Sequence, residues 1–199
     1  MSLTISLTPD EVEQCLAALH IECRFTAAER VAYATTPVVK LPERLFAYPV
    51  PSDSSLLTLS NIKDRVGTDP KRPPSFFDNP WYQSEQFMST RCTPGWHILS
   101  MEPISGSLQQ PVDYLRSNPE LELPQAVEVV LMLFLHFVHR GEQLLFKKHS
   151  WCSDMASLNR HVTVGAFGRN GVFLSAHPSN FSSQGLGVCA KIRLPGDNR

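Results

Sequence analysis

This sequence lacks an excess of either charge, which limits the partners that it can attract. Its 18 Lys and Arg residues are balanced by 19 Asp and Glu residues, so the formal net charge is -1. Proteins that bind nucleic acid usually present a strongly basic face, whereas the only basic doublets here are Lys71-Arg72 and Lys147-Lys148. The composition therefore argues against nucleic acid as a partner.

Long uninterrupted apolar runs are also missing. The longest apolar stretch is interrupted by Glu128, His136 and His139, and it falls short of the ~20 apolar residues that a membrane-spanning helix needs. The first residues, MSLTISLTPDE, contain neither the basic nor the apolar region of a signal peptide. We therefore expect a cytoplasmic protein that is soluble and makes no contact with a membrane.

Two kinds of cysteine and glycine motif are absent. The five cysteines are odd in number and contain no C-x-x-C pair, which is typical of free thiols in a reducing compartment. The glycine-containing stretches at 165–168 and 185–187 do not match the phosphate-binding or dinucleotide-binding fingerprints. We therefore expect no disulfide and no cofactor.

The distribution of proline divides the chain into three segments. Thirteen of the 16 prolines lie between Pro37 and Pro124, and proline disfavours long regular elements because it removes a backbone donor. Residues 1–34 contain two capping-box patterns and predict a helical hairpin. Residues 35–80 predict an extended segment wrapped on the body of the protein or ordered by a partner, and residues 81–199 predict the core domain.

The strongest structural signals lie in the last third of the chain. A dense apolar run from Pro124 to Arg140, followed by Gly141, predicts a helix buried on most sides. The sequence Asn170-Gly171, between the β-branched and aromatic runs 162–167 and 172–176, predicts a hairpin, because both residues tolerate positive φ. Together these patterns predict an α+β fold with an antiparallel C-terminal sheet, a hairpin plus a third strand, packed on the long helix.

The remaining elements are predicted from shorter patterns. Expected helical segments cover 61–66, 80–90, 112–116 and 155–158, the last capped by Ser153 and Asp154. Expected strands cover 56–59, 95–101, 143–148 and 186–194.

One catalytic hypothesis is a cysteine hydrolase that uses Cys92, His161 and Asn180. A thiolate nucleophile needs a histidine that accepts its proton and a third group that orients the histidine. This order is similar to that of papain-like cysteine proteases, in which a glutamine, here Gln86, precedes the cysteine and the histidine opens a strand. The sequence departs from that family because Pro94 and Gly95 follow the cysteine, and because the C-G-[SA]-C-[WY] signature is absent.

A second hypothesis is a metal site formed by His136, His139 and His149. Residues three apart on a helix share a face, and imidazole suits zinc. The alternative interpretation needs no metal: His136 would be a histidine at the edge of the core that hydrogen-bonds to backbone, and His139 would suit the negative end of the helix dipole. On that interpretation the protein holds no metal.

A third set of candidates could line a pocket for a small ligand. Polar side chains beside an aromatic one often do so, and these residues are His149, Trp151, Cys152, Asp154, His161 and His177. No catalytic motif is complete, so we expect a non-catalytic binding protein whose partner is another protein or a small ligand.

Overall fold

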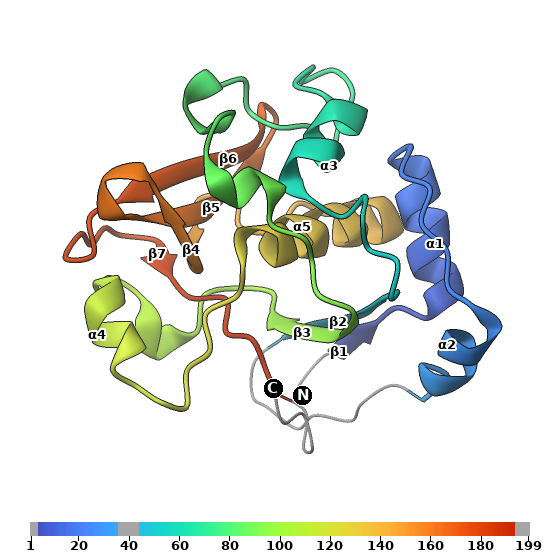
Figure 1. Ribbon diagram of the computed structural model, residues 1–199. Coiled ribbons are helices and arrows are strands. Elements are labelled where there is room, and N and C mark those ends of the chain that lie inside the picture. Colours follow the sequence, from blue (N-terminus) through green and yellow to red (C-terminus); the bar gives the residue numbers. More distant parts are fainter. Residues whose placement is uncertain (1–3, 36–43, 194–199) are drawn as a thin grey trace.

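The chain folds as an α+β protein, as the sequence predicts. The computed structural model describes residues 4–35 and 44–193, and its helices and strands form two separate sheets with a long helix, α5, between them (Figure 1). The predictions that concern residues 36–43 and 194–199 lie outside the described residues.

The N-terminal segment begins with a strand, β1 (Thr4–Ser6), followed by helices α1 (Pro9–Ala18) and α2 (Ala27–Ala32). Both predicted capping boxes are confirmed. The Thr8 hydroxyl accepts a hydrogen bond from the Glu11 amide, and the Glu11 carboxylate accepts one from the Thr8 amide. Thr26 and Glu29 form the same pair of bonds. These contacts satisfy amides that have no partner inside the helix.

The first sheet contains β1, β2 (Leu45–Val50) and β3 (Gly95–Ser100) in that order. β1 is parallel to β2, and β2 is antiparallel to β3. Every residue of β2 is buried, so the proline-rich segment contributes the central strand of this sheet. From its prolines, the sequence predicted an extended segment without long regular elements here. The structure instead has a buried strand.

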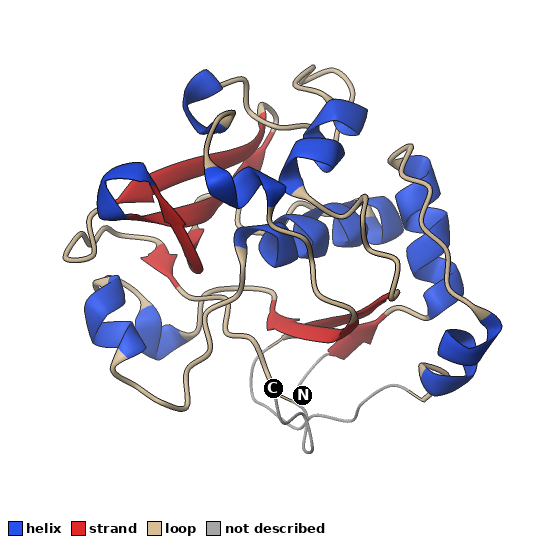
Figure 2. Cartoon of the chain, in the orientation of Figure 1, coloured by secondary structure: helices blue, strands red, loops and turns tan. Residues whose placement is uncertain are grey.

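Helix α5 (Ala126–Arg140) lies between the two sheets, and its residues from Ala126 to His136 are all buried (Figure 2). Gly141 ends it in the left-handed conformation, as the sequence predicts, with φ of 73°. One hydrophobic cluster joins α1, β2, α5 and the second sheet. All three predicted segments therefore contribute to one core.

The second sheet contains β4 (His149–Ala156), β5 (Arg160–Gly168), β6 (Gly171–His177) and β7 (Leu186–Gly187), in the order β6-β5-β4-β7. The predicted hairpin is β5 and β6, but its turn lies one residue earlier than expected. Gly168 pairs with Gly171, so Arg169 and Asn170 form the loop. Of Asn170 and Gly171, only the glycine has positive φ, at 92°.

Several of the shorter predictions are wrong. Residues 80–90 form two 3-10 turns, Pro80–Tyr82 and Gln86–Ser89, instead of one helix. Residues 143–148 form turns, with Leu145 at φ of 55°. Residues 155–158 end β4 and enter a turn, and the third strand is only the two-residue β7, which is parallel to β4.

Two other short helices, α3 (Leu59–Val66) and α4 (Val112–Arg116), include the segments 61–66 and 112–116 that the sequence predicts to be helical. Helix α3 begins where the strand 56–59 was expected, because the Thr58 hydroxyl caps its first turn. Helix α4 has the predicted bounds. In the described ranges of the chain, no helix is both long and apolar enough to cross a membrane.

Candidate functional site

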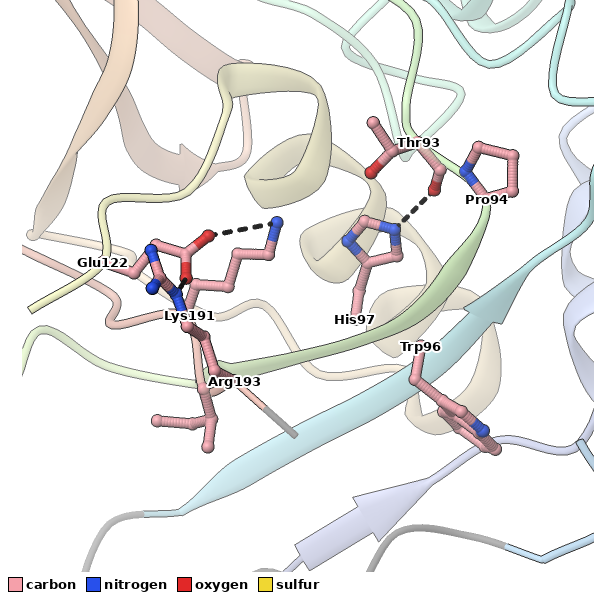
Figure 3. Close-up of a pocket in the computed structure, with 8 residues that line it drawn as sticks. Thr93, Pro94, Trp96, His97, Glu122, Lys191 and Arg193 are labelled. Carbon is pink, nitrogen blue, oxygen red and sulfur yellow. Dashed lines mark hydrogen bonds and ion pairs between the residues drawn. The ribbon is translucent and has the colours of Figure 1, made fainter. Parts of the chain in front are cut away.

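A polar cleft opens where β3, the segment before α5 and the segment 191–193 meet. It has two lobes, a larger one of about 450 Å3 and a smaller one of about 180 Å3. Thr93, Glu122, Lys191 and Arg193 line both lobes. Figure 3 shows them among the residues of the smaller lobe. Because the ligands of small-molecule sites occupy pockets of roughly 300–1,000 Å3, the cleft is large enough for a metabolite.

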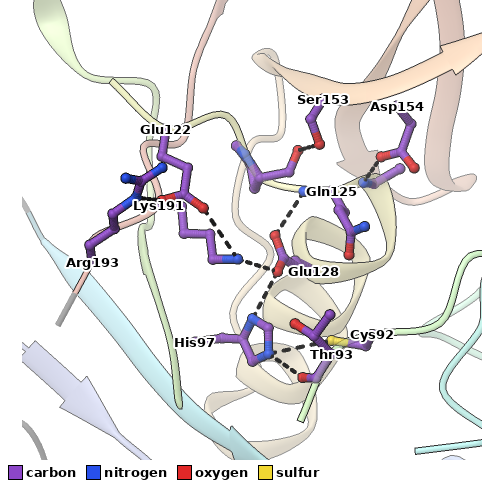
Figure 4. A network of polar contacts seen from close by, with 12 residues as sticks. Cys92, Thr93, His97, Glu122, Gln125, Glu128, Ser153, Asp154, Lys191 and Arg193 are labelled. Carbon is purple, nitrogen blue, oxygen red and sulfur yellow. Dashed lines mark hydrogen bonds and ion pairs between the residues drawn. The ribbon is translucent and has the colours of Figure 1, made fainter. Parts of the chain in front are cut away.

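The Glu128 carboxylate lies at the floor of the larger lobe, and each of its oxygens is occupied. Oε2 accepts a hydrogen bond from the Gln125 amide at 2.7 Å, which caps the first turn of α5. Oε1 lies 2.9 Å from His97 Nδ1 and 2.8 Å from Lys191 Nζ (Figure 4). The Glu128 side chain is only 1% exposed, so these contacts replace its hydration.

The surroundings of His97 on β3 favour its cationic form. Its Nδ1 faces the Glu128 carboxylate, and its Nε2 lies 2.7 Å from the Thr93 carbonyl oxygen. Both neighbours are acceptors, and only an imidazolium can donate from both ring nitrogens. Burial alone would lower the pKa of His97, but the Cys92 sulfur and the Glu128 carboxylate raise it to about 10. The Tyr48 ring stacks on the imidazole at 5.3 Å.

Lys191 connects this buried pair to the surface. The backbone amide of Lys191 donates to the Glu122 carbonyl, and the neighbouring Ile192 amide donates to Ile98 of β3. This pairing directs the Lys191 side chain toward Glu128, with Glu122 Oε1 3.5 Å away. Arg193 then contacts Glu122 Oε2 at 2.5 Å. The result is a row of alternating charges that leads from the core to the rim of the cleft.

The network lowers the pKa of Glu128 and keeps it ionised. Burial would raise that pKa, but His97 and Lys191 together lower it to about 2. A buried ion pair is seldom more stable than well-packed apolar residues of similar size, because desolvation offsets the attraction. Groups whose pKa is strongly shifted by specific partners, and which lie in a cleft, are candidates for a functional role. The network is therefore the centre of the candidate site.

The raised pKa of His97 predicts a specific dependence of stability on pH. Because the folded protein holds this proton more tightly than the unfolded chain does, the contribution of His97 to stability is full below pH 6.5, and it is lost as the pH rises toward 10. We expect the free energy of unfolding to decrease across this window with a slope of at most about 1.4 kcal/mol per pH unit from this one group. Urea unfolding of the wild type and His97→Gln at several pH values checks it, since the variant should lack that contribution. Equal slopes in the two proteins would contradict the assignment.

The hydrolase candidate Cys92 lies beside this network, but with a different histidine from the one predicted. Its sulfur lies 3.7 Å from His97 Nε2, whereas His161 packs edge-on against Trp151. Asn180 is exposed in the turn after β6. Cys92, His97 and Glu128 thus follow the order of a catalytic triad. However, Cys92 is completely buried and is not among the residues that line the cleft, and His97 Nε2 is engaged by Thr93.

Four of the six ligand-binding candidates gather on one face of the second sheet, namely His149, Trp151, His161 and His177. The structure confirms that the two hairpin histidines lie opposite each other at the open end of β5 and β6. The Trp151 ring contacts both of them edge-on, and His177 stacks on Phe181 at 4.2 Å. Burial lowers the pKa of all three histidines. None of the four lines the cleft.

Two of these four side chains are enclosed within the protein. His161 is only 3% exposed. Its position opposite His177 and beside Trp151 encloses it. Trp151 is completely buried, and its indole N–H donates to the Gln110 carbonyl at 3.2 Å.

The other two ligand-binding candidates have structural roles. Asp154 does not cap a helix at 155–158. Its carboxylate, on strand β4, instead accepts a hydrogen bond from the Ala126 amide at 2.6 Å and so caps the start of helix α5. Burial raises the pKa of Asp154 to about 6. Cys152 is fully buried, and burial raises the pKa of its thiol.

Each of the three histidines of the metal hypothesis has a different neighbour within the protein. His136 is buried and its Nδ1 lies 3.2 Å from the Glu142 carbonyl, which confirms the interpretation as a core-edge histidine bonded to backbone. His139 lies near Glu11 of α1, and His149 contacts Phe173. Among residues 4–35 and 44–193, no group of three or more His, Cys, Asp or Glu side chains could hold a metal ion.

Sequence reasoning missed Glu128, His97 and Lys191 as site residues. One signal was present: Glu128 interrupts an apolar helix, and a carboxylate buried on all sides needs charged or hydrogen-bonding partners. The identity of those partners is not visible in the sequence, because His97 is on β3 and Lys191 is 63 residues further along the chain.

We compared the chain with protein-family models, with curated proteins and with solved structures, and none of the three comparisons gave a match. The residues of the cleft are therefore the basis of the function proposed below.

Proposed function

We propose that this protein is a non-catalytic binding protein that holds a small anionic molecule, with a carboxylate or a phosphate group, in the polar cleft. The observation that carries the proposal is an imbalance among the charged groups of the cleft. Its acidic side chains are already occupied by partners within the protein, whereas two of its cationic side chains, Arg116 and Lys191, retain hydrogen-bond donors.

The acidic side chains of the cleft are Glu122 and Glu128. Glu128 is engaged by His97, Lys191 and the Gln125 amide. Glu122 is engaged by Lys191 through one oxygen and by Arg193 through the other. A cationic ligand would have to displace these contacts, which makes the cleft a poor site for a cation.

Two cationic side chains of the cleft, Arg116 and Lys191, can donate further hydrogen bonds to a ligand. Arg116, at the end of α4, lines the larger lobe of the cleft and makes no ion pair with any residue in the described ranges. Lys191 contacts two carboxylates, and an ammonium group has three N–H donors. Guanidinium and ammonium groups bind carboxylate and phosphate through charge-assisted hydrogen bonds, which are stronger than neutral ones.

The preference for a non-catalytic role follows from Cys92. A nucleophile has to reach its substrate, and this thiol is enclosed behind His97 and is not exposed in the cleft. Cys92→Ala should therefore leave ligand binding intact.

The proposal is tested by titrating the protein with succinate and with inorganic phosphate, using glycerol as a neutral probe, in an isothermal calorimeter at low ionic strength. We expect an anion to bind and glycerol not to bind. Replacing Arg116 or Lys191 with Gln should weaken the binding by about ten- to a hundredfold, because each change removes one charge-assisted hydrogen bond.

Arg65→Gln is the matched control, because Arg65 is an exposed arginine on α3 that does not line the cleft. It should bind the same anion as tightly as the wild type does. If neither anion binds, or if Arg65→Gln weakens the binding as much as Arg116→Gln does, the cleft is not an anion site.

A further inference from the structure

The turn between β4 and β5 exposes a leucine in a conformation that leucine rarely adopts. Leu158 and Asn159 have φ of 60° and 52°, and Leu158 is 82% exposed. The left-handed conformation costs an L-residue roughly 1–2 kcal/mol, and an exposed leucine gains nothing from burial. Backbone strain of this kind is found mainly where it has a function, so the turn is a candidate contact surface.

Hydrogen bonds from another segment hold this turn in place. The Glu85 carboxylate accepts one bond from the Ser157 amide at 2.8 Å and another from the Ser157 hydroxyl at 2.5 Å. Leu158 is therefore presented on a fixed turn. An apolar side chain on a fixed turn loses less conformational entropy when it binds than one on a mobile loop, which favours its use as an anchor.

A groove of about 310 Å3 lies directly beside the turn, and Leu158 forms part of its edge. Trp81, Ala156 and Phe173 supply apolar walls. An engineered core cavity of roughly 150 Å3 holds benzene, so this groove has room for a leucine side chain. The protruding group and the groove that fits it are on the same surface.

From this arrangement we propose that the protein forms a symmetric homodimer in which Leu158 of each copy enters the groove of the other. In a twofold dimer the same surface meets itself, so every contact between two different residues occurs twice. A surface that carries both an exposed leucine and an apolar groove satisfies this requirement without a second protein.

The charges on this surface are also complementary to themselves. Glu85 and Arg160 both line the groove, and Arg160 makes no ion pair with another residue of the described ranges. A carboxylate has about four lone-pair sites, so Glu85 can accept from Ser157 and from an arginine of a second copy. Twofold pairing would bring Glu85 of each copy to Arg160 of the other, which favours a second copy over an unrelated partner.

The test is sedimentation velocity of the full chain across a wide range of protein concentrations. We expect a concentration-dependent dimer that Leu158→Asn weakens at least about tenfold, because a central apolar anchor is lost. Asparagine tolerates the left-handed conformation, so this variant should unfold at the same or a higher temperature than the wild type. Arg160→Glu should also weaken the dimer, because it places like charges opposite each other.

Val31→Asn is the matched control, because Val31 is another exposed apolar residue, 78% exposed on α2. It should dimerise as the wild type does. A wild type that stays monomeric at every concentration, or a dimer that Leu158→Asn leaves unchanged, would overturn the proposal. These outcomes are independent of anion binding in the cleft.

Discussion

Replacing Glu128 with Gln should reduce the free energy of unfolding by about 3–5 kcal/mol, because it leaves the buried His97 cation without its counter-charge. Gln keeps the size of the side chain and can still cap the first turn of α5, so the loss reports the charge. Folded domains are stable by only about 5–15 kcal/mol, so the effect should be a large fraction of the total. Urea unfolding followed by tryptophan fluorescence measures it.

Glu122→Gln is the matched control for that experiment. Glu122 is 27% exposed and contacts Lys191 and Arg193 at the rim of the cleft, where ion pairs contribute about 0–1 kcal/mol. The double variant Glu128→Gln with His97→Gln should recover some of the lost stability, since no buried charge then lacks its partner. If the double variant were less stable by the full sum of the two single effects, the two residues would not act as a pair.

Gly165→Ala should destabilise the protein by about 3 kcal/mol or more, since a methyl group there would overlap neighbouring backbone. A Cβ atom at this position would lie 2.1 Å from the Lys148 carbonyl oxygen and 2.6 Å from the His149 Cα. Backbone cannot move aside as the end of a flexible side chain can, so β4 and β5 would have to separate. Thermal unfolding followed by circular dichroism measures the change.

Gly106→Ala controls for the addition of a methyl group. A Cβ atom at Gly106 would meet nothing within 4 Å, and its φ is not in the left-handed region. We expect its unfolding temperature to match that of the wild type. A Gly165→Ala protein as stable as Gly106→Ala would show that the two strands are not this close.

The fold could be predicted wherever a pattern is local. The capping boxes at Thr8 and Thr26, the buried helix that ends at Gly141 and the hairpin of β5 and β6 each depend on neighbouring residues. Predictions failed where a distant contact decided the outcome. Asp154, for example, looked like the cap of a following helix, but it caps α5 from a strand.

The candidate site also depends on one local sequence signal and on distant contacts that the sequence does not show. Its strongest sequence signal was Glu128, a carboxylate inside an apolar helix, and the sequence determined by itself that this charge would need partners once buried. Only the tertiary structure decided that these partners are His97 and Lys191, because sheet pairing brings β3 and the segment around Lys191 together beside the start of α5. Local sequence determines which elements form and which faces are apolar, whereas the packing of those elements determines which polar groups meet.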